Sequence, residues 1–196
     1  CFDKIAPHRK VGAVAEGRLA EPPRRFSGVV PANGPRAVQS ELLADTKAMP
    51  AQLRDRFPHP YTQQDADWFL ADACRSTPRT AFAIEVGGEA AGGIGLTIGT
   101  DVARATAEVG YWLGKAHWGR GIMTNVLRAV TAEAIRSFSL HRIHAVPFAG
   151  NTASARVLEK AGYRLEGRLR RSAVKDGRVL DQLMYAITDV DYPIGD

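Results

Sequence analysis

The segment that most restricts the fold is residues 106–138, where a strand pattern leads into a helix pattern through a turn that contains Gly119 and Gly121. Glycine has no side chain, so an anion can approach the first backbone N–H groups of the helix, which lack intrahelical partners and lie at the positive end of its dipole. The segment therefore predicts a phosphate site, although an ordinary helix-start turn explains the loop equally well when it is taken alone. The strand pattern consists of Ala107, Val109, Tyr111 and Leu113 alternating with Thr106, Glu108, Gly110 and Trp112, and the helix pattern consists of Met123, Val126, Leu127, Val130, Ala134 and Phe138.

Size and composition predict a single soluble domain. The chain has 196 residues, 45% of them hydrophobic, which is enough to bury a core. No apolar run is long enough to cross a membrane, and the opening residues contain Asp3, Lys4, Arg9 and Lys10 in place of an apolar signal segment. We therefore expect a cytoplasmic protein with no membrane partner, and Cys1 in place of an initiator Met suggests a processed or truncated start.

Charge and cysteine usage exclude some classes of site. Cys1 and Cys74 lack metal-ligand spacing, so neither a zinc site nor a disulfide framework is expected, and we expect no metal. The net charge of +5 suits an anionic ligand, an acidic protein partner or RNA. Acidic residues interrupt the late arginines and no aromatic ladder accompanies them, so we interpret them as a solvated hairpin face and do not expect nucleic acid as a partner. These arginines are Arg164, Arg168, Arg170, Arg171 and Arg178.

Sequence patterns divide the chain into a weakly structured lead-in (1–24), one domain (25–188) and a tail (189–196). The order of strands and helices in the domain predicts a mixed α+β sheet packed by helices. Gly162 is expected to end the last helix, and Asp176-Gly177 to form the turn of the last hairpin. The expected strands are 26–30, 80–86, 90–98, 106–113, 141–148, 163–174 and 178–187, and the expected helices are 36–47, 51–56, 62–75, 123–138 and 151–161.

Four motifs in this order of elements point to a known family. They are Ala107 to Leu113 (AEVGYWL), Trp118 to Thr124 (WGRGIMT), Asn151-x-x-Ser154 and Leu158 to Tyr163 (LEKAGY). With them, residues 50–188 resemble the GNAT superfamily of acyl-CoA-dependent N-acetyltransferases. The branch that looks most similar is the ribosomal-protein N-terminal (alanine/serine) acetyltransferases, on the further signals Phe57 to Thr62 (FPHPYT), Glu166-Gly167, Asp176-Gly177 and Asp181.

The resemblance implies a mixed, mostly antiparallel sheet of about seven strands whose central strands splay apart. Acetyl-CoA would lie between the strand that ends near Leu113 and the strand that begins near His141. The family pattern expects Arg or Gln three residues before Gly119, where this chain has Ala116. Main-chain amides can still bind the pyrophosphate, and a surface role for Arg120 is as good an interpretation as phosphate binding. The implied cofactor-binding residues are Tyr111, Trp112, Leu113, Trp118, Gly119, Arg120, Gly121, Ile122, Met123, Thr124 and Asn151.

Two residues are candidates for acid–base chemistry. Glu108 shares a strand face with Gly110 and can take the ammonium proton of the acceptor, but a structural pair with a nearby arginine is an equally good interpretation. The family's usual Tyr acid is replaced by Leu158, and the resemblance implies Ser154 as the donor to the leaving thiolate. Ser154 can instead cap a helix amide, and Asn151 has the same two interpretations, as a helix cap or as a pantetheine ligand.

The leading hypothesis is therefore an N-acetyltransferase that moves acetyl from acetyl-CoA directly to a primary amine, with Glu108 as base and Ser154 as donor. The acceptor is a protein N-terminus or a small-molecule amine, and a monomer and a homodimer both remain open. The alternatives are a non-catalytic acyl-CoA-binding module and an RNA- or ribosome-binding domain that uses the late arginines.

Overall fold

The structure is a computed structural model of the chain, and it describes residues 26–31, 64, 78–87 and 89–191. Almost all of the segment that holds the three expected helices at 36–47, 51–56 and 62–75 lies outside these residues, as do the lead-in and the end of the tail. The expectations for those segments stay predictions. The strand expected at 26–30 is confirmed as β1 (Phe26–Pro31).

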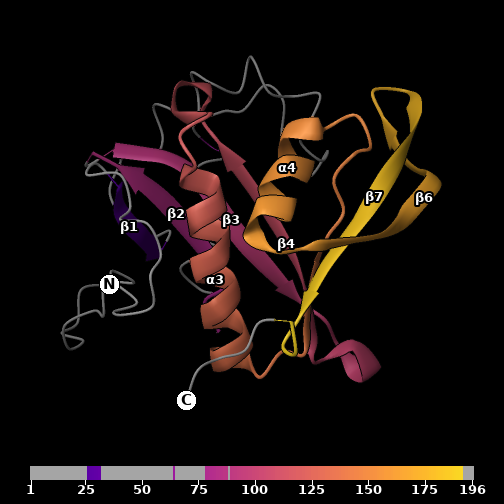
Figure 1. The fold of residues 1–196 in the computed structure, drawn as a ribbon, viewed down its shortest axis with the longest axis horizontal. Helices are drawn as coiled ribbons and strands as arrows, with labels where there is room; N and C mark the ends of the chain where they lie inside the picture. The colour runs from indigo at the N-terminus through magenta and orange to yellow at the C-terminus, as the bar shows by residue number, and fades with distance from the viewer. Residues whose placement is uncertain (1–25, 32–63, 65–77, 88, 192–196) are drawn as a thin grey trace.

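The described residues form one seven-stranded sheet in the order β1-β2-β3-β4-β5-β7-β6 (Figure 1). All neighbouring strands are antiparallel except β4 and β5, which run parallel. The mixed α+β sheet expected from the sequence is confirmed. The other strands are β2 (Ala81–Val86), β3 (Glu89–Ile98), β4 (Thr106–Leu113), β5 (Arg142–Ala145), β6 (Arg164–Lys175) and β7 (Arg178–Thr188).

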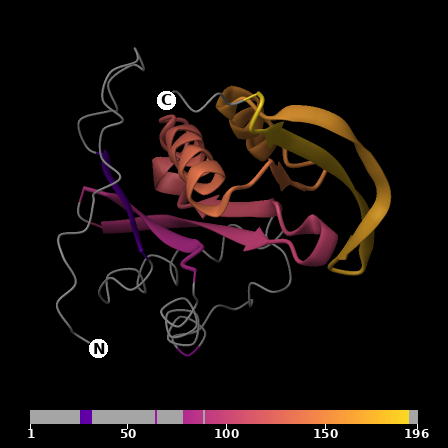
Figure 2. The same cartoon turned by 90° about the horizontal axis from the view of Figure 1, so that it is seen from below.

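Two helices, α3 (Ile122–Phe138) and α4 (Thr152–Ala161), lie together on one face of the sheet (Figure 2). The apolar stripe of α3 packs into the core, where Val126 and Leu127 have no exposed surface. Burying a side chain of this size stabilises the fold by about 1.5–3 kcal/mol. The strand side of the same core includes Ile84, Ile94, Val109 and Ile143.

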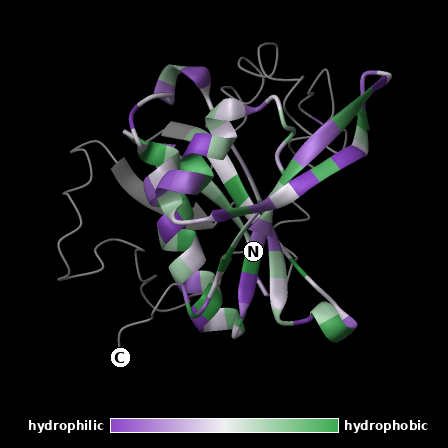
Figure 3. Ribbon diagram, turned by 45° about the vertical axis from the view of Figure 1, so that its right-hand side comes forward, coloured by the Kyte–Doolittle hydropathy of each residue, from purple (hydrophilic) through white to green (hydrophobic). Residues whose placement is uncertain are grey.

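The helix ends follow the signals in the sequence. Gly121, with φ +73°, is the N-cap of α3, and Gly162, with φ +98°, is the C-cap of α4, as expected. The short 3-10 turns η2 (Asp101–Ala103) and η3 (Lys115–His117) flank β4. Hydrophobic and hydrophilic residues are interspersed along the β6–β7 hairpin (Figure 3), and its five arginines are exposed, as the solvated-face interpretation requires.

One expected strand is wrong in length. The sequence pattern predicts a strand over 141–148, but β5 spans only four residues, Arg142–Ala145. Pro147 has no N–H to donate, and its carbonyl accepts the N–H of Leu183 at 2.9 Å. Phe148 forms an isolated bridge with Gln182. After Ala145 the chain therefore follows β7 and leaves β4 behind.

This divergence opens the centre of the sheet. β4 and β5 pair at only three positions, Thr106 with Arg142, Ala107 with Ile143 and Glu108 with His144. β4 continues for five residues to Leu113 while keeping its register with β3. The central strands are splayed, as the family resemblance implies.

Candidate functional site

The free edge of β4 is defined by the direction of its main-chain groups. On one side the N–H of Gly114 donates to Ala91 on the β3 side at 2.8 Å, and on the other the N–H of His141 donates to Ala105 at 2.8 Å. Because alternate residues of a strand face opposite neighbours, Val109, Tyr111 and Leu113 turn their N–H and C=O groups toward the β5 side. β5 has ended there, so this edge borders the opening.

The turn after β4 is held in place by an indole. Trp118 Nε1 donates to the carbonyl of Leu113 at 2.6 Å. This bond ties the exposed Trp118 to the end of β4, three residues before the N-cap of α3. The side chain of Trp112 lies over Gly93 on the neighbouring strand β3. A Cβ at Gly93 would lie 2.8 Å from the indole nitrogen of Trp112, so this position leaves no room for a side chain.

The first turn of α3 presents uncapped amides. Its N-cap, Gly121, has no side chain to cap it, and its first intrahelical bond from a residue after the cap is Asn125 N–H to Gly121 O at 3.1 Å. The N–H groups of Ile122, Met123 and Thr124 therefore have no intrahelical acceptor, while their side chains are buried. The helix offers only main-chain donors to a ligand at this end.

Glycine geometry keeps this end of α3 open. Gly119 and Gly121 have φ of +71° and +73°, a region that disfavours side chains, and a Cβ on either would meet nothing within 4 Å. Arg120 is exposed between them, 3.4 Å from His117 Nδ1. The turn thus combines accessible main-chain N–H groups with the positive end of the helix dipole, an arrangement that favours an anion.

The first turn of α4 reaches the same opening. Asn151 is the N-cap, and its Oδ1 accepts the N–H of Ser154 at 3.0 Å. The Ser154 hydroxyl is 2.8 Å from the hydroxyl of Tyr111 on β4. Burial raises the pKa of Tyr111 to about 12. The helix-cap interpretation therefore fits Asn151, whereas the Ser154 hydroxyl has a partner outside its own helix.

Glu108 lies at the point where the strands separate. It is half-buried, and its register partners are Thr97 on β3 and His144 on β5. Its side chain is on the strand face opposite to those of Val109 and Tyr111, as the alternation predicts. The sequence predicts no role for His144, and only the pairing of β4 with β5 places it beside Glu108. Leu158 is fully buried in the core.

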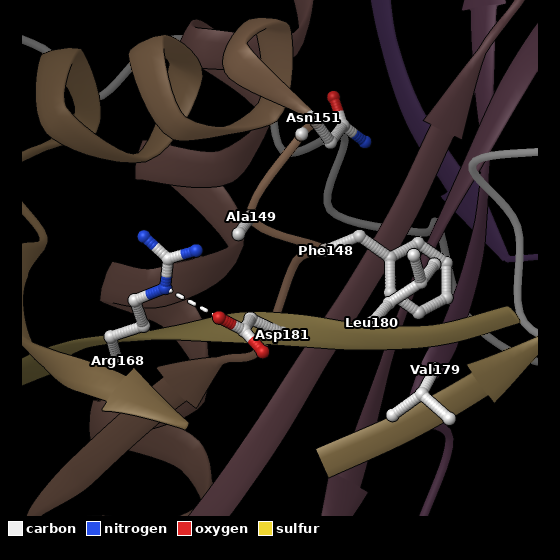
Figure 4. A pocket seen from close by; sticks show the side chains of 8 residues that line it. Phe148, Ala149, Asn151, Arg168, Val179, Leu180 and Asp181 are labelled. Carbon is white, nitrogen blue, oxygen red and sulfur yellow. Dashed lines mark hydrogen bonds and ion pairs between the residues drawn. The ribbon is translucent and has the colours of Figure 1, made fainter. Parts of the chain in front are cut away.

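A pocket of about 540 Å³ lies between the chain after β5 and the β6–β7 hairpin (Figure 4). Asn151 contributes to its wall, so it adjoins the first turn of α4. Asp181 accepts Arg168 Nε and the N–H of Arg171, both at 2.7 Å. These bonds, the backbone one first, lower the pKa of Asp181. The lining residues are Phe148, Ala149, Gly150, Asn151, Arg168, Val179, Leu180 and Asp181.

Within the described part of the chain, no group of His, Cys, Asp and Glu side chains is arranged to hold a metal ion. No helix in the same part is long and apolar enough to span a membrane.

Comparison with known proteins gives one family. A family model described as an acetyltransferase (GNAT) domain matches residues 35–164, more than half of the chain. A probable N-acetyltransferase, YjcK of Bacillus subtilis, is 44% identical over 89 residues, which is 45% of this chain and 49% of that protein. The ribosomal-protein-serine acetyltransferase of Escherichia coli is 33% identical over 81 residues, 41% of this chain and 45% of that protein. The chain spans about half the length of the curated relatives it matches.

Solved structures share the fold. RimJ of Mycobacterium smegmatis, in complex with CoA-disulfide, has a TM-score of 0.67 and 28% identity, and the match covers 78% of this chain and 76% of that one. A ribosomal L7/L12 acetyltransferase, RimL, in complex with coenzyme A has a TM-score of 0.68 at 23% identity, over 78% of this chain and 86% of that one.

Proposed function

This chain belongs to the acetyltransferase (GNAT) domain family, and from that premise we propose that it transfers acetyl from acetyl-CoA directly to a primary amine. The observation that supports this most is the turn between β4 and α3. Its uncapped amides and two open glycines form an anion site next to a free strand edge. Those are the two kinds of surface that a pyrophosphate and an extended amide-containing arm require.

In this proposal each part of acetyl-CoA has a place. The pyrophosphate accepts the N–H groups of Ile122, Met123 and Thr124, with Arg120 near the adenosine phosphates. The pantetheine amides pair with the edge at Tyr111, as an added strand would, and approach the end of the edge at Leu113. The residues fit the cofactor because the edge and the helix end meet at the same turn. RimJ of Mycobacterium smegmatis, of the same fold, is in complex with CoA-disulfide.

The chemistry needs a neutral amine, a stabilised oxyanion and support for the leaving thiolate. We assign the first task to Glu108, at the separation of β4 and β5. The N–H of Leu113 faces the opening and is available to the oxyanion. Ser154, on the far side of the opening, is the donor to the thiolate. Bound acetyl-CoA supplies the activated acyl group.

For the acceptor we propose a protein N-terminus. Two curated relatives support it, the ribosomal-protein-serine acetyltransferase of Escherichia coli and a putative ribosomal N-acetyltransferase, YdaF, of Bacillus subtilis, which is 31% identical over 87 residues. The pocket beside Asn151 would give such a peptide room next to the first turn of α4. A small-molecule amine would use the same machinery.

The test is an acetyl-CoA turnover screen across small amines and N-terminal peptides, with CoA release as the readout. Glu108→Gln is expected to bind acetyl-CoA as the wild type does and to turn over about 100-fold more slowly. Glu133→Gln is the matched control, because Glu133 lies on α3 and pairs with Arg136 and Ser137. It should keep full activity.

Other outcomes identify the alternatives. If the protein binds acetyl-CoA but does not release CoA with any of the amines tested, it is a non-catalytic binder. Nucleic-acid affinity with a steep salt dependence that survives saturating acetyl-CoA would favour the RNA- or ribosome-binding domain and the exposed hairpin arginines.

A further inference from the structure

Two hydroxyl groups from different elements meet at the opening. The Tyr111 hydroxyl, on β4, is 2.8 Å from Ser154 Oγ and 3.3 Å from the Ser154 carbonyl oxygen, on α4. The residues are 43 positions apart in the chain. The Ser154 carbonyl lies inside a regular helix and accepts a helical N–H. The hydroxyl oxygen of Ser154 is therefore the better acceptor for the phenol, because it is closer than the carbonyl oxygen and does not already accept a helical N–H.

Tyr111 connects the two sides of the opening, β4 and α4. Its main-chain groups are on the free edge of β4, while its ring packs against the core and its hydroxyl reaches α4. Ser154 is held from the other side as well, because its N–H donates to Asn151 Oδ1. Both the backbone and the hydroxyl of Ser154 are thus fixed relative to the strand that borders the opening.

We propose that Tyr111 is a positioning residue for acetyl transfer, which donates a hydrogen bond from its hydroxyl to Ser154 Oγ and so directs the Ser154 proton at the sulfur of the cofactor. The inference rests on the proposed function and deepens it, since it concerns the same site. With the oxygen of Ser154 occupied as an acceptor, its one proton is free for the sulfur.

The step balances without a further reactant. The amine attacks the acetyl carbon, a C–N bond forms and the C–S bond breaks, and the sulfur takes the electron pair. Glu108 takes the proton of the amine. The Ser154 hydroxyl donates a hydrogen bond to the thiolate and keeps its proton, and the thiolate leaves with CoA and equilibrates with solvent.

The phenol itself stays protonated throughout. A pKa of about 12, raised by burial, keeps the hydroxyl of Tyr111 protonated near neutral pH. In the proposal this hydroxyl therefore donates a hydrogen bond to Ser154 and does not alternate between acid and base.

The first experiment is a double-mutant cycle with Tyr111→Phe and Ser154→Ala. Tyr111→Phe keeps the ring and removes only the hydroxyl. Losing one hydrogen bond of ordinary strength should lower kcat about threefold to tenfold and leave the KM for acetyl-CoA within about twofold. The double variant should be no slower than Ser154→Ala, because Tyr111 acts through Ser154. Multiplied single effects, or an unchanged kcat in Tyr111→Phe, would overturn the inference.

A matched control separates positioning from folding. Tyr163 and Thr131 form a second tyrosine hydroxyl pair at 2.7 Å, buried between α3 and the end of α4. Tyr163→Phe should lower stability as Tyr111→Phe does, but leave kcat unchanged. Equal losses of kcat in both phenylalanine variants would contradict a specific role for Tyr111.

The second experiment needs no acceptor. The thiol of bound CoA is titrated by the ultraviolet absorbance of its thiolate. A hydrogen bond from Ser154 stabilises the thiolate, so the bound thiol should titrate at a lower pH in the wild type than in Tyr111→Phe or Ser154→Ala. If the bound thiol titrates at the same pH in the wild type and in both variants, the inference about Tyr111 is wrong, while the proposed function is unaffected. A wild type that binds CoA, shows the shift and acetylates no amine would instead contradict the proposed function.

Discussion

Glu108 on β4 lies directly beside His144 on β5, and these two residues are the last pair before the parallel strands separate. Neighbours at the same register of a parallel pair extend from the same face of the sheet. Glu108, the residue assigned as general base, therefore lies at the closed end of the opening, where the two strands still pair. Beyond it, no strand among the described residues pairs with this edge of β4.

Gly121→Ala should weaken acetyl-CoA binding. Gly121 has φ +73° at the N-cap of α3, so a side chain there strains the backbone by about 1 kcal/mol and places a methyl beside the free amides. Loss of one hydrogen bond to a charged group would lower the affinity about tenfold. Calorimetric titration with acetyl-CoA measures it.

Gly177→Ala is the control for that substitution. Gly177 has φ +72° and a Cβ there would also meet nothing within 4 Å, but it lies at the turn of the β6–β7 hairpin. It should cost similar stability and leave the affinity for acetyl-CoA unchanged. Equal loss of affinity in the two variants would show that the turn before α3 is no special site.

Two substitutions at Asn151 separate its two roles. Asn151→Ala removes the N-cap bond to Ser154 and should lower the free energy of unfolding by about 1 kcal/mol. Asn151→Asp keeps a capping oxygen and loses the amide donor, so stability should be retained. If the amide binds pantetheine, both variants should lose affinity for acetyl-CoA. Chemical denaturation measures the free energy of unfolding, and calorimetry measures the affinity for acetyl-CoA. An unchanged affinity in Asn151→Asp would limit this residue to capping.

Leu158→Tyr should destabilise the fold without gain in turnover. Leu158 has no exposed surface, so a larger side chain with a hydroxyl must displace the core, at a cost of about 1–3 kcal/mol. Thermal unfolding measures the loss of stability and CoA release measures turnover. Faster turnover in this variant would mean that the phenol reaches the opening and that Ser154 is not the required donor.

Asp181 should stabilise the β6–β7 hairpin in a pH-dependent way. The N–H of Arg171 and the Arg168 side chain lower its pKa in the folded state. Its contribution is therefore present above the pKa of the unfolded chain and is lost as the pH falls through the folded-state pKa. Asp181→Asn should be less stable than the wild type near neutral pH and equally stable in strong acid. Denaturation across this pH range is the measurement, and a pH-independent difference would contradict the charge-based account.

Local patterns account for what could be predicted. The strand at 106–113, the glycine turn, the helix over 123–138 and the cap at Gly162 each depend on residues close together in sequence. The structure places β4 (Thr106–Leu113), α3 (Ile122–Phe138) and the end of α4 (Thr152–Ala161) accordingly. Gly119 and Gly121 have the positive φ that their residue type favours.

The remainder depends on contacts between distant segments. The apolar run after His141 looks like one strand, yet regular pairing with β7 stops at Ala145 and only an isolated bridge from Phe148 to Gln182, 34 residues along the chain (182 minus 148), continues it. The position of His144 likewise follows from register across strands, and the Tyr111–Ser154 contact and the pocket beside Asp181 follow from the packing of elements that are distant in sequence. A single sequence contains no local signal for such register.

The β6 edge of the sheet affects whether copies of the protein can associate by pairing their strands. β6 is the last strand, and its register with β7 shifts between Leu169 and Ala173, where Arg171 takes a left-handed conformation. A strand from another molecule that approached this margin would find interrupted hydrogen-bonding groups and the like charges of Arg168 and Arg170. Bulges and cationic side chains of this kind discourage intermolecular β-pairing. We therefore expect this edge of the hairpin to resist β-pairing between copies of the protein.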